Sequence, residues 1–187
     1  HDWKANVDFI DNQLHAIGIN FDAVYSSDLE RARQTAKFYA ESFGIADVIA
    51  VPEMKEINYG KLQTRKKSWV KGNYSQYKKN PDYVFPDGES FRQMQQRSVQ
   101  YLSSLAAAHS KETVLIVSHA GVIRGMVSHF LGLEYATSLK HSISFRYIGD
   151  FLFDGENCVG YDELGKPSGF VQDGVIEIPF SRSITNS

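Results

Sequence analysis

The sequence predicts an α/β fold in which a mostly parallel sheet is covered by helices on both faces and followed by β-rich C-terminal hairpins. Strand-like and helix-like segments alternate as far as about residue 135. Residues 113–119, TVLIVSH, form a continuous apolar run, which is typical of a strand covered on both faces. Beyond residue 141 the pattern changes to strands separated by turn residues. These three observations fit a single domain over residues 1–187.

The first half of the chain predicts two helices and two strands. Apolar residues recur at helical spacing from residue 3 to residue 17, and residues 21–27 follow as a short buried strand. Ser27 and Glu30 have the spacing of a capping box, which predicts that a helix begins there and ends near Gly44. Residues 48–54 are the second strand candidate.

The second half begins with a long surface excursion, residues 57–88, rich in Tyr, Lys, Asn and Pro, with a short helix expected around Trp69. Excursions of this length often cover a functional site. Ser90 and Gln93 then predict the capped start of a long helix to about residue 109. The apolar strand at 113–119 and the helix at 121–133 come next. Strands are predicted at 142–154 and 169–180, with turns between them and a loose polar tail at 181–187.

Composition excludes several functional classes. The 187 residues carry a net charge of −2, so nothing favours binding to nucleic acid or to an anionic membrane. No apolar run approaches the roughly 20 residues that a membrane-spanning helix needs. Cys158 is the only cysteine and cannot form an internal disulfide, which favours a reducing, cytoplasmic location.

Three reactive residue types follow predicted strands, and the carboxyl ends of strands are where α/β sheets bind ligands. Arg31 lies in the first turn of a helix, where a cation suits a bound anion, although pairing with Asp28 or Glu30 explains it equally simply. Glu56 is a candidate general acid or an ordinary surface glutamate. His119 precedes Ala120 and Gly121, small residues that allow a ligand to approach the backbone; it is otherwise a packed strand-end histidine. Together the three residue types form a coherent set for phosphoryl transfer.

Four stretches carry a family resemblance: YSSDLERARQTA, EINYGKLQ, FPDGESFRQMQQR and IVSHAGVIRG, in this order. They resemble the phosphoglycerate-mutase-like branch of the histidine phosphatase superfamily over roughly residues 1–135. The resemblance implies a phosphohistidine intermediate and no metal or cofactor. It implies that Arg31 and His119 bind the phosphoryl group beside Ala120 and Gly121, and that Glu56 is the proton donor. The Gly88-Glu89-Ser90 turn is expected to be structural.

One motif of that family is missing. Its nucleophilic histidine lies in an Arg-His-Gly motif on a first strand, and no Arg-His-Gly occurs in this sequence. We therefore expect a further N-terminal segment of roughly 20 to 40 residues, enough for one strand, a motif loop and a connection. Without that strand, the sheet is expected to show an open edge, a hydrophobic slot and half a phosphate pocket.

The expected function is hydrolysis of a small phosphorylated metabolite. A mutase reaction of the phosphoglycerate type is the nearest alternative, and a non-catalytic module that binds a phosphorylated ligand or a protein is another. The segment from Gly60 to Gly88 looks short for a mutase, which favours the phosphatase. The β-rich end at 141–180 fits either a homodimer edge or a lid.

Overall fold

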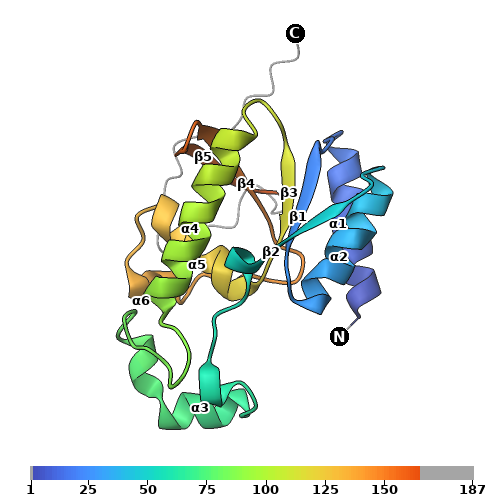
Figure 1. The fold of residues 1–187 in the computed structure, drawn as a ribbon. Coiled ribbons are helices and arrows are strands. Elements are labelled where there is room, and N and C mark those ends of the chain that lie inside the picture. The colour runs from blue at the N-terminus through green and yellow to red at the C-terminus, as the bar shows by residue number, and fades with distance from the viewer. Residues whose placement is uncertain (1, 165–187) are drawn as a thin grey trace.

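The computed structural model describes residues 2–164, which form a three-stranded parallel sheet, a separate hairpin and the surrounding helices (Figure 1). The sheet order is β2-β1-β3, with β1 (Ala23–Ser27) in the middle. β2 (Val48–Val51) pairs with one edge of β1, so that Val24 lies opposite Val48. β3 (Val114–Val117) pairs with the other edge, so that Ala23 lies opposite Val114. All three strands therefore end on the same side of the sheet.

Helices cover both faces of this sheet, as predicted (Figure 1). On one face lie α1 (Trp3–Ala16) and α2 (Glu30–Ser42), and on the other lie α4 (Phe91–Ala108) and α5 (Ala120–Phe130). Successive strand residues point to opposite faces. Val24 of β1 accordingly packs against Ala36 and Ala40 of α2, and Tyr25 belongs to the larger core on the other face.

The predicted capping box of α4 is present, because the Ser90 hydroxyl accepts from the Gln93 N–H and the Gln93 side chain accepts from the Ser90 N–H. The capping box predicted at Ser27 was wrong, because it does not form. α2 begins at Glu30 after the N-cap residue Leu29, and no side chain caps it. Ser27 Oγ instead accepts from the Leu29 N–H at 3.2 Å, and this local bond competes with helical capping.

The excursion predicted at 57–88 contains three short helical segments, which are η2 (Gly60–Leu62), α3 (Lys67–Asn73) and η3 (Ser75–Lys78). The strand predicted at 48–54 is shorter than expected, because β2 ends at Val51 and a 3-10 turn, η1 (Pro52–Met54), starts at the proline. α3 is the short helix expected around Trp69. Phe85 anchors the excursion to the core, since it is 2% exposed and its ring contacts the rings of Tyr59, Tyr77 and Tyr83. Glu89, in the turn that follows, accepts a hydrogen bond from the Asn58 N–H at 2.8 Å, so this turn has the structural role expected of it.

After α5 come α6 (Tyr135–Ser138) and an antiparallel hairpin of β4 (Ile148–Asp154) and β5 (Asn157–Leu164). β5 lies in a stretch where the sequence predicted only turns, so that prediction was wrong. Its Tyr161 ring packs on Phe151, and this cross-strand contact stabilises the pair despite two acidic residues and a glycine. The predicted strand at 169–180 and the predicted tail at 181–187 lie outside the described residues.

β3 differs from its prediction in one respect. Its VLIV sequence predicts a strand covered on both faces, yet all four residues are only partly buried. The reason is its position: among the described residues β3 is an edge strand, paired with β1 on one side only.

Candidate active site

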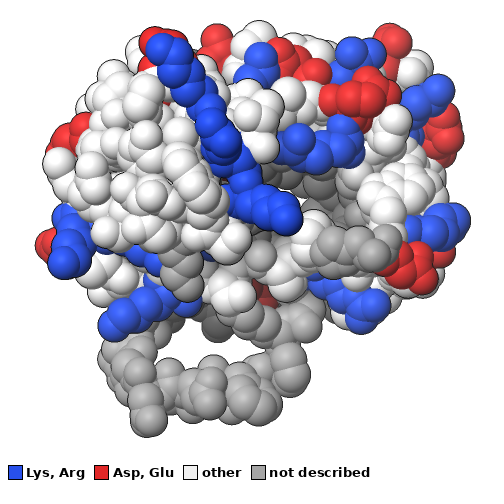
Figure 2. Space-filling model, turned by 90° about the horizontal axis from the view of Figure 1, so that it is seen from below, with Lys and Arg blue, Asp and Glu red and all other residues white. Residues whose placement is uncertain are grey.

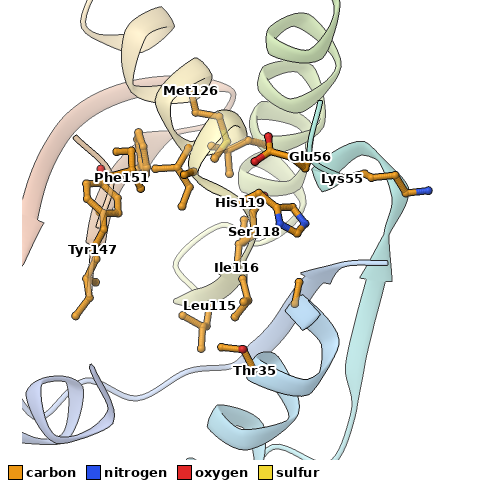
Figure 3. Close-up of a pocket in the computed structure, with 18 of the residues that line it drawn as sticks. Thr35, Lys55, Glu56, Leu115, Ile116, Ser118, His119, Met126, Tyr147 and Phe151 are labelled. Atoms are coloured by element: carbon orange, nitrogen blue, oxygen red, sulfur yellow. The ribbon is translucent and has the colours of Figure 1, made fainter. Parts of the chain in front are cut away.

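The carboxyl ends of the three parallel strands bring the predicted site residues together. Arg31 follows β1, Glu56 follows β2 and His119 follows β3. Their side chains line one cavity, and Figure 3 shows the Glu56 carboxylate and the His119 ring on the same side of it. Residues far apart in sequence therefore meet at the edge of the sheet where the sequence predicted a site.

His119 is buried, with 7% of its surface exposed, and its Nε2 lies 2.8 Å from the hydroxyl oxygen of Ser27. Burial, followed by the positive charge of Arg31, lowers the pKa of His119 from 6.5 to about 4. At neutral pH the ring is therefore uncharged, with one N–H donor and one acceptor nitrogen. In the tautomer protonated at Nδ1, Ser27 donates to Nε2, and the Nδ1–H is available to a ligand oxygen.

Arg31 has no acidic partner among residues 2–164 at salt-bridge distance. The two carboxylates proposed as its neighbours are engaged elsewhere. Asp28 pairs with Lys55 at 2.9 Å, and Glu30 accepts from the Gln34 amide at 3.0 Å. Within the described part of the chain, this exposed guanidinium has no acidic partner; it lies in the first turn of α2, close enough to lower the pKa of His119, and is suited to hold an anion.

Glu56 is fixed by the backbone at the start of α5. Its Oε1 accepts from its neighbour Ile57 N–H at 3.0 Å, and its Oε2 accepts from the Gly121 N–H at 3.3 Å. Each oxygen keeps a second lone pair, so the carboxyl group can still carry or accept a proton. Glu56 is therefore a carboxylate held by two backbone N–H groups rather than a free surface side chain.

Gly121 is required by this arrangement. A Cβ atom at this position would lie 2.2 Å from Glu56 Oε1, well inside the contact limit. Only glycine lets the carboxylate approach the first turn of α5 so closely. Ala120, the residue before it, also lines the cavity.

Arg97 of α4 braces the loop that carries Glu56. Its guanidinium pairs with Glu89 through two nitrogens, at 2.7 and 3.0 Å, and donates to the Lys55 carbonyl at 2.7 Å. Both side chains are at least three-quarters buried, at 25% and 18% exposure. This bidentate pair therefore fixes the backbone next to the proposed proton donor.

The cavity continues along the open edge of β3 towards β4 and has a volume of about 2220 Å³. Figure 3 shows Leu115 and Ile116 of β3 on one side, with Tyr147 and Phe151 across the space from them. This part of the cavity is thus an apolar slot beside a strand edge. At Ser118 and His119 the slot meets the polar part of the cavity, which Arg31 and Glu56 line.

Sequence reasoning identified Arg31, Glu56 and His119 but missed Ser27 and Arg97. Ser27 looked like a capping residue, and only the fold shows that it contacts His119, 92 positions away. Arg97 lies inside the FPDGESFRQMQQR stretch, but its position on the helix gave no sign of its distant partners.

A family model describing the histidine phosphatase superfamily (branch 1) matches residues 13–155. The chain belongs to this superfamily. The matched range contains Arg31, Glu56 and His119, so all three lie within the family domain.

Curated relatives of this chain include both phosphatases and mutases. A metal-independent phosphoserine phosphatase of Arabidopsis thaliana is 38% identical over 62% of the chain and 50% of its own length. An adenosylcobalamin/alpha-ribazole phosphatase of Escherichia coli is 28% identical over 64% of the chain and 62% of its own length. A 2,3-bisphosphoglycerate-dependent phosphoglycerate mutase of Bartonella henselae is 29% identical over 83% of the chain and 80% of its own length. The chain therefore covers only half to three-fifths of the first two relatives.

Solved structures agree on the fold. A phosphoserine phosphatase of Entamoeba histolytica in complex with 3-phosphoglyceric acid superposes with a TM-score of 0.71 at 24% identity, covering 86% of this chain and 82% of that one. The alpha-ribazole phosphatase of Shigella flexneri superposes with a TM-score of 0.69 at 22% identity, covering 86% of this chain and 81% of that one. None of the helices within residues 2–164 combines the length and apolar character needed to cross a bilayer.

Proposed function

We propose that this protein hydrolyses a small phosphomonoester through a phosphohistidine intermediate. The observation that carries the proposal is the Arg31 guanidinium, which has no acidic partner among residues 2–164, beside the neutral His119 and the anchored Glu56. Arg31 supplies a positive charge for the phosphoryl oxygens, and His119 supplies a hydrogen-bond donor without adding a second charge. Such preorganised donors stabilise the charge that spreads over the oxygens during transfer.

Glu56 handles the proton in both steps. A histidine nitrogen attacks phosphorus while the bond to the leaving oxygen breaks, and Glu56 gives its proton to that oxygen. A water molecule then attacks the phosphohistidine, Glu56 takes a proton from this water, and inorganic phosphate is released as the histidine is regenerated. Gly121 and Ile57 hold the carboxyl group in one orientation throughout.

We propose that the attacking histidine follows a strand that occupies the slot beside β3. The outer edge of β3 has no strand partner among residues 2–164, so it offers backbone hydrogen bonds, and the apolar side chains facing the slot would bury such a strand. A strand running parallel to β3 would end next to Ser118 and His119, so the residue after it would reach the phosphoryl site. This placement fits a segment upstream of residue 1.

The test is to trap the phosphoenzyme. The full-length protein is incubated with a labelled phosphomonoester and quenched, and an acid-labile, base-stable label on histidine is expected. Wild type should turn over p-nitrophenyl phosphate, whereas His119→Ala should lose on the order of 10²–10³ in kcat. Undiminished activity of that variant would refute the role of His119. A reading frame that begins near His1 would refute the upstream nucleophile and support the non-catalytic alternative.

A mutase reaction remains the second candidate, because the phosphoglycerate mutase of Bartonella henselae matches over more of the chain than either phosphatase relative. Incubation with 3-phosphoglycerate separates the two reactions. Release of inorganic phosphate supports hydrolysis, and accumulation of 2-phosphoglycerate supports the mutase.

A further inference from the structure

Residues 61–79, within the excursion, form a strongly basic stretch of the chain. They contain seven of the 20 Lys and Arg residues and not one Asp or Glu. The other 13 basic residues are outnumbered by 22 acidic ones, so the net charge of −2 conceals a marked separation of charge along the chain. The expectation that no anionic membrane is bound rests on that net charge alone, and it overlooks the local positive potential of this stretch.

Four of these basic side chains lie on the excursion without an acidic partner. Figure 1 shows the excursion, labelled α3, protruding below the sheet and its helices. Three of the four side chains are exposed and one is half-buried, and in the described part of the chain no carboxylate lies within salt-bridge distance of any of them. α3 and η3, which carry or flank them, are in contact. Together with one aromatic residue they form a surface that we call the basic tip: Arg65, Lys66, Trp69, Lys78 and Lys79.

Trp69 gives the basic tip an exposed aromatic ring in a fixed position. Val70 anchors α3, since it is 8% exposed and belongs to the core, whereas Trp69 beside it points outwards and is 41% exposed. The Arg65 guanidinium lies over the indole, 5.1 Å from the ring centroid, and the Tyr74 ring lies 5.9 Å away. An exposed indole among basic side chains is typical of surfaces that lie at the boundary between water and lipid headgroups.

The composition of the basic stretch distinguishes between anionic partners. Six of the seven basic residues at 61–79 are lysines, compact charges that suit a diffuse anionic surface, whereas protein interfaces are depleted in lysine and enriched in arginine. Single-stranded nucleic acid stacks its bases on open aromatic faces, but Arg65 already covers a face of Trp69. A bilayer needs neither a pocket nor a stacking face, only a protruding surface with positive charge and an amphipathic ring.

We propose that the basic tip docks this protein reversibly on the surface of a bilayer that contains anionic lipid. The basic side chains contact the anionic headgroups, and the Trp69 indole lies among them. Arg65 and Lys78 also line the large cavity, so a docked molecule holds the candidate active site close to the lipid surface. Figure 2 views the molecule from below and shows Lys and Arg side chains around the hollow in the middle of this face, while Asp and Glu lie mainly towards its rim. The inference does not depend on the proposed phosphatase reaction.

The test is sedimentation of the full-length protein with sucrose-loaded vesicles. Vesicles of equal parts phosphatidylcholine and phosphatidylserine should carry the protein down, vesicles of phosphatidylcholine alone should not, and binding should weaken as salt is added. Lys66→Gln combined with Lys79→Gln should weaken binding about 25-fold, since each basic residue near such a surface contributes about fivefold. The control pair, Lys37→Gln with Lys111→Gln, removes two exposed charges outside the excursion and should leave binding unchanged.

Trp69 supplies a second readout that does not depend on the lysine variants. Its fluorescence should shift to shorter wavelengths on vesicles that contain phosphatidylserine, because the indole leaves water for the headgroup region. The shift should be present in wild type and absent in Trp69→Phe. Binding of vesicles by wild type without this shift would overturn docking through the basic tip.

Other outcomes would also overturn the proposal. Equal binding to phosphatidylcholine vesicles, or an equal loss in the control pair, would show that the basic tip does not recognise anionic lipid. Tighter binding of poly-uridylate or poly-glutamate, at the same concentration of anionic charge, would overturn the choice of lipid. Release from vesicles by inorganic phosphate at constant ionic strength would assign these side chains to the phosphoryl site instead of a docking surface.

Discussion

Replacing Gly121 by alanine should disable the proton donor without touching the phosphoryl ligands. The added Cβ would lie 2.2 Å from Glu56 Oε1, and real Cβ contacts do not fall below 3.0 Å. Glu56 Oε1 must therefore retreat by at least about 0.8 Å, and this movement turns the carboxylate away from the position in which Oε2 accepts from the Gly121 N–H at 3.3 Å. A misplacement of about 1 Å costs on the order of 10²-fold in rate.

The assay uses two substrates that differ in their need for an acid. Glycerol 3-phosphate expels an alkoxide that must be protonated, whereas p-nitrophenyl phosphate expels a stable anion. Gly121→Ala should lower kcat on glycerol 3-phosphate by about 10²-fold and change kcat on p-nitrophenyl phosphate much less. Glu56→Gln should show the same dependence on the leaving group.

Gly72→Ala is the matched control, because a Cβ there meets nothing within 4 Å. It should leave both rates unchanged, and it should stabilise α3 slightly. An equal loss on both substrates by Gly121→Ala would show that the substitution damages the site generally. No loss on either substrate would show that Glu56 is not the proton donor, and either result would refute the reasoning.

Three further outcomes are expected. The pKa of His119 is about 4 when folded and 6.5 when unfolded, so its contribution to stability is complete above pH 6.5 and is lost as the pH falls towards 4. In chemical denaturation, the free energy of unfolding of wild type should fall by up to about 3 kcal/mol more than that of His119→Gln as the pH is lowered through this range, and parallel profiles would contradict the assignment. Arg31→Ala should lose on the order of 10²–10³ in kcat, with an unfolding midpoint close to wild type because it breaks no ion pair within residues 2–164; a large drop in midpoint would indicate a structural role. Arg97→Met should destabilise the fold by about 3 kcal/mol by leaving Glu89 unpaired, and it should lower kcat through the loop that carries Glu56; normal thermal unfolding would argue against the brace.

Much of this fold could be predicted because its helices each bury one face. The periodic apolar residues of α1, α2 and α4 reflect local geometry, and the Ser90 capping box is also local. Strand pairing is not local. The sequence of β3 does not show that it has a partner on one side only, and the sequence of β5 does not show that Tyr161 will pack on Phe151.

The residues of the candidate site also fall into those that the sequence could predict and those that it could not. Arg31, Glu56 and His119 could be predicted because parallel strands end at one edge of the sheet, so residues that follow them meet there. Ser27 and Arg97 could not, because their partners are distant in sequence and their own surroundings suggested ordinary roles.

The open edge of β3 also bears on how these 187 residues behave at high concentration. Val114–Val117 is a short, uncharged, β-branched segment whose outer backbone groups have no strand partner among residues 2–164. Such an edge is a template for pairing with the same segment of another molecule, and it favours aggregation. Light scattering of residues 1–187 should therefore rise with protein concentration. A soluble peptide that docks against this edge should suppress the rise, as should a lysine substituted for Leu115.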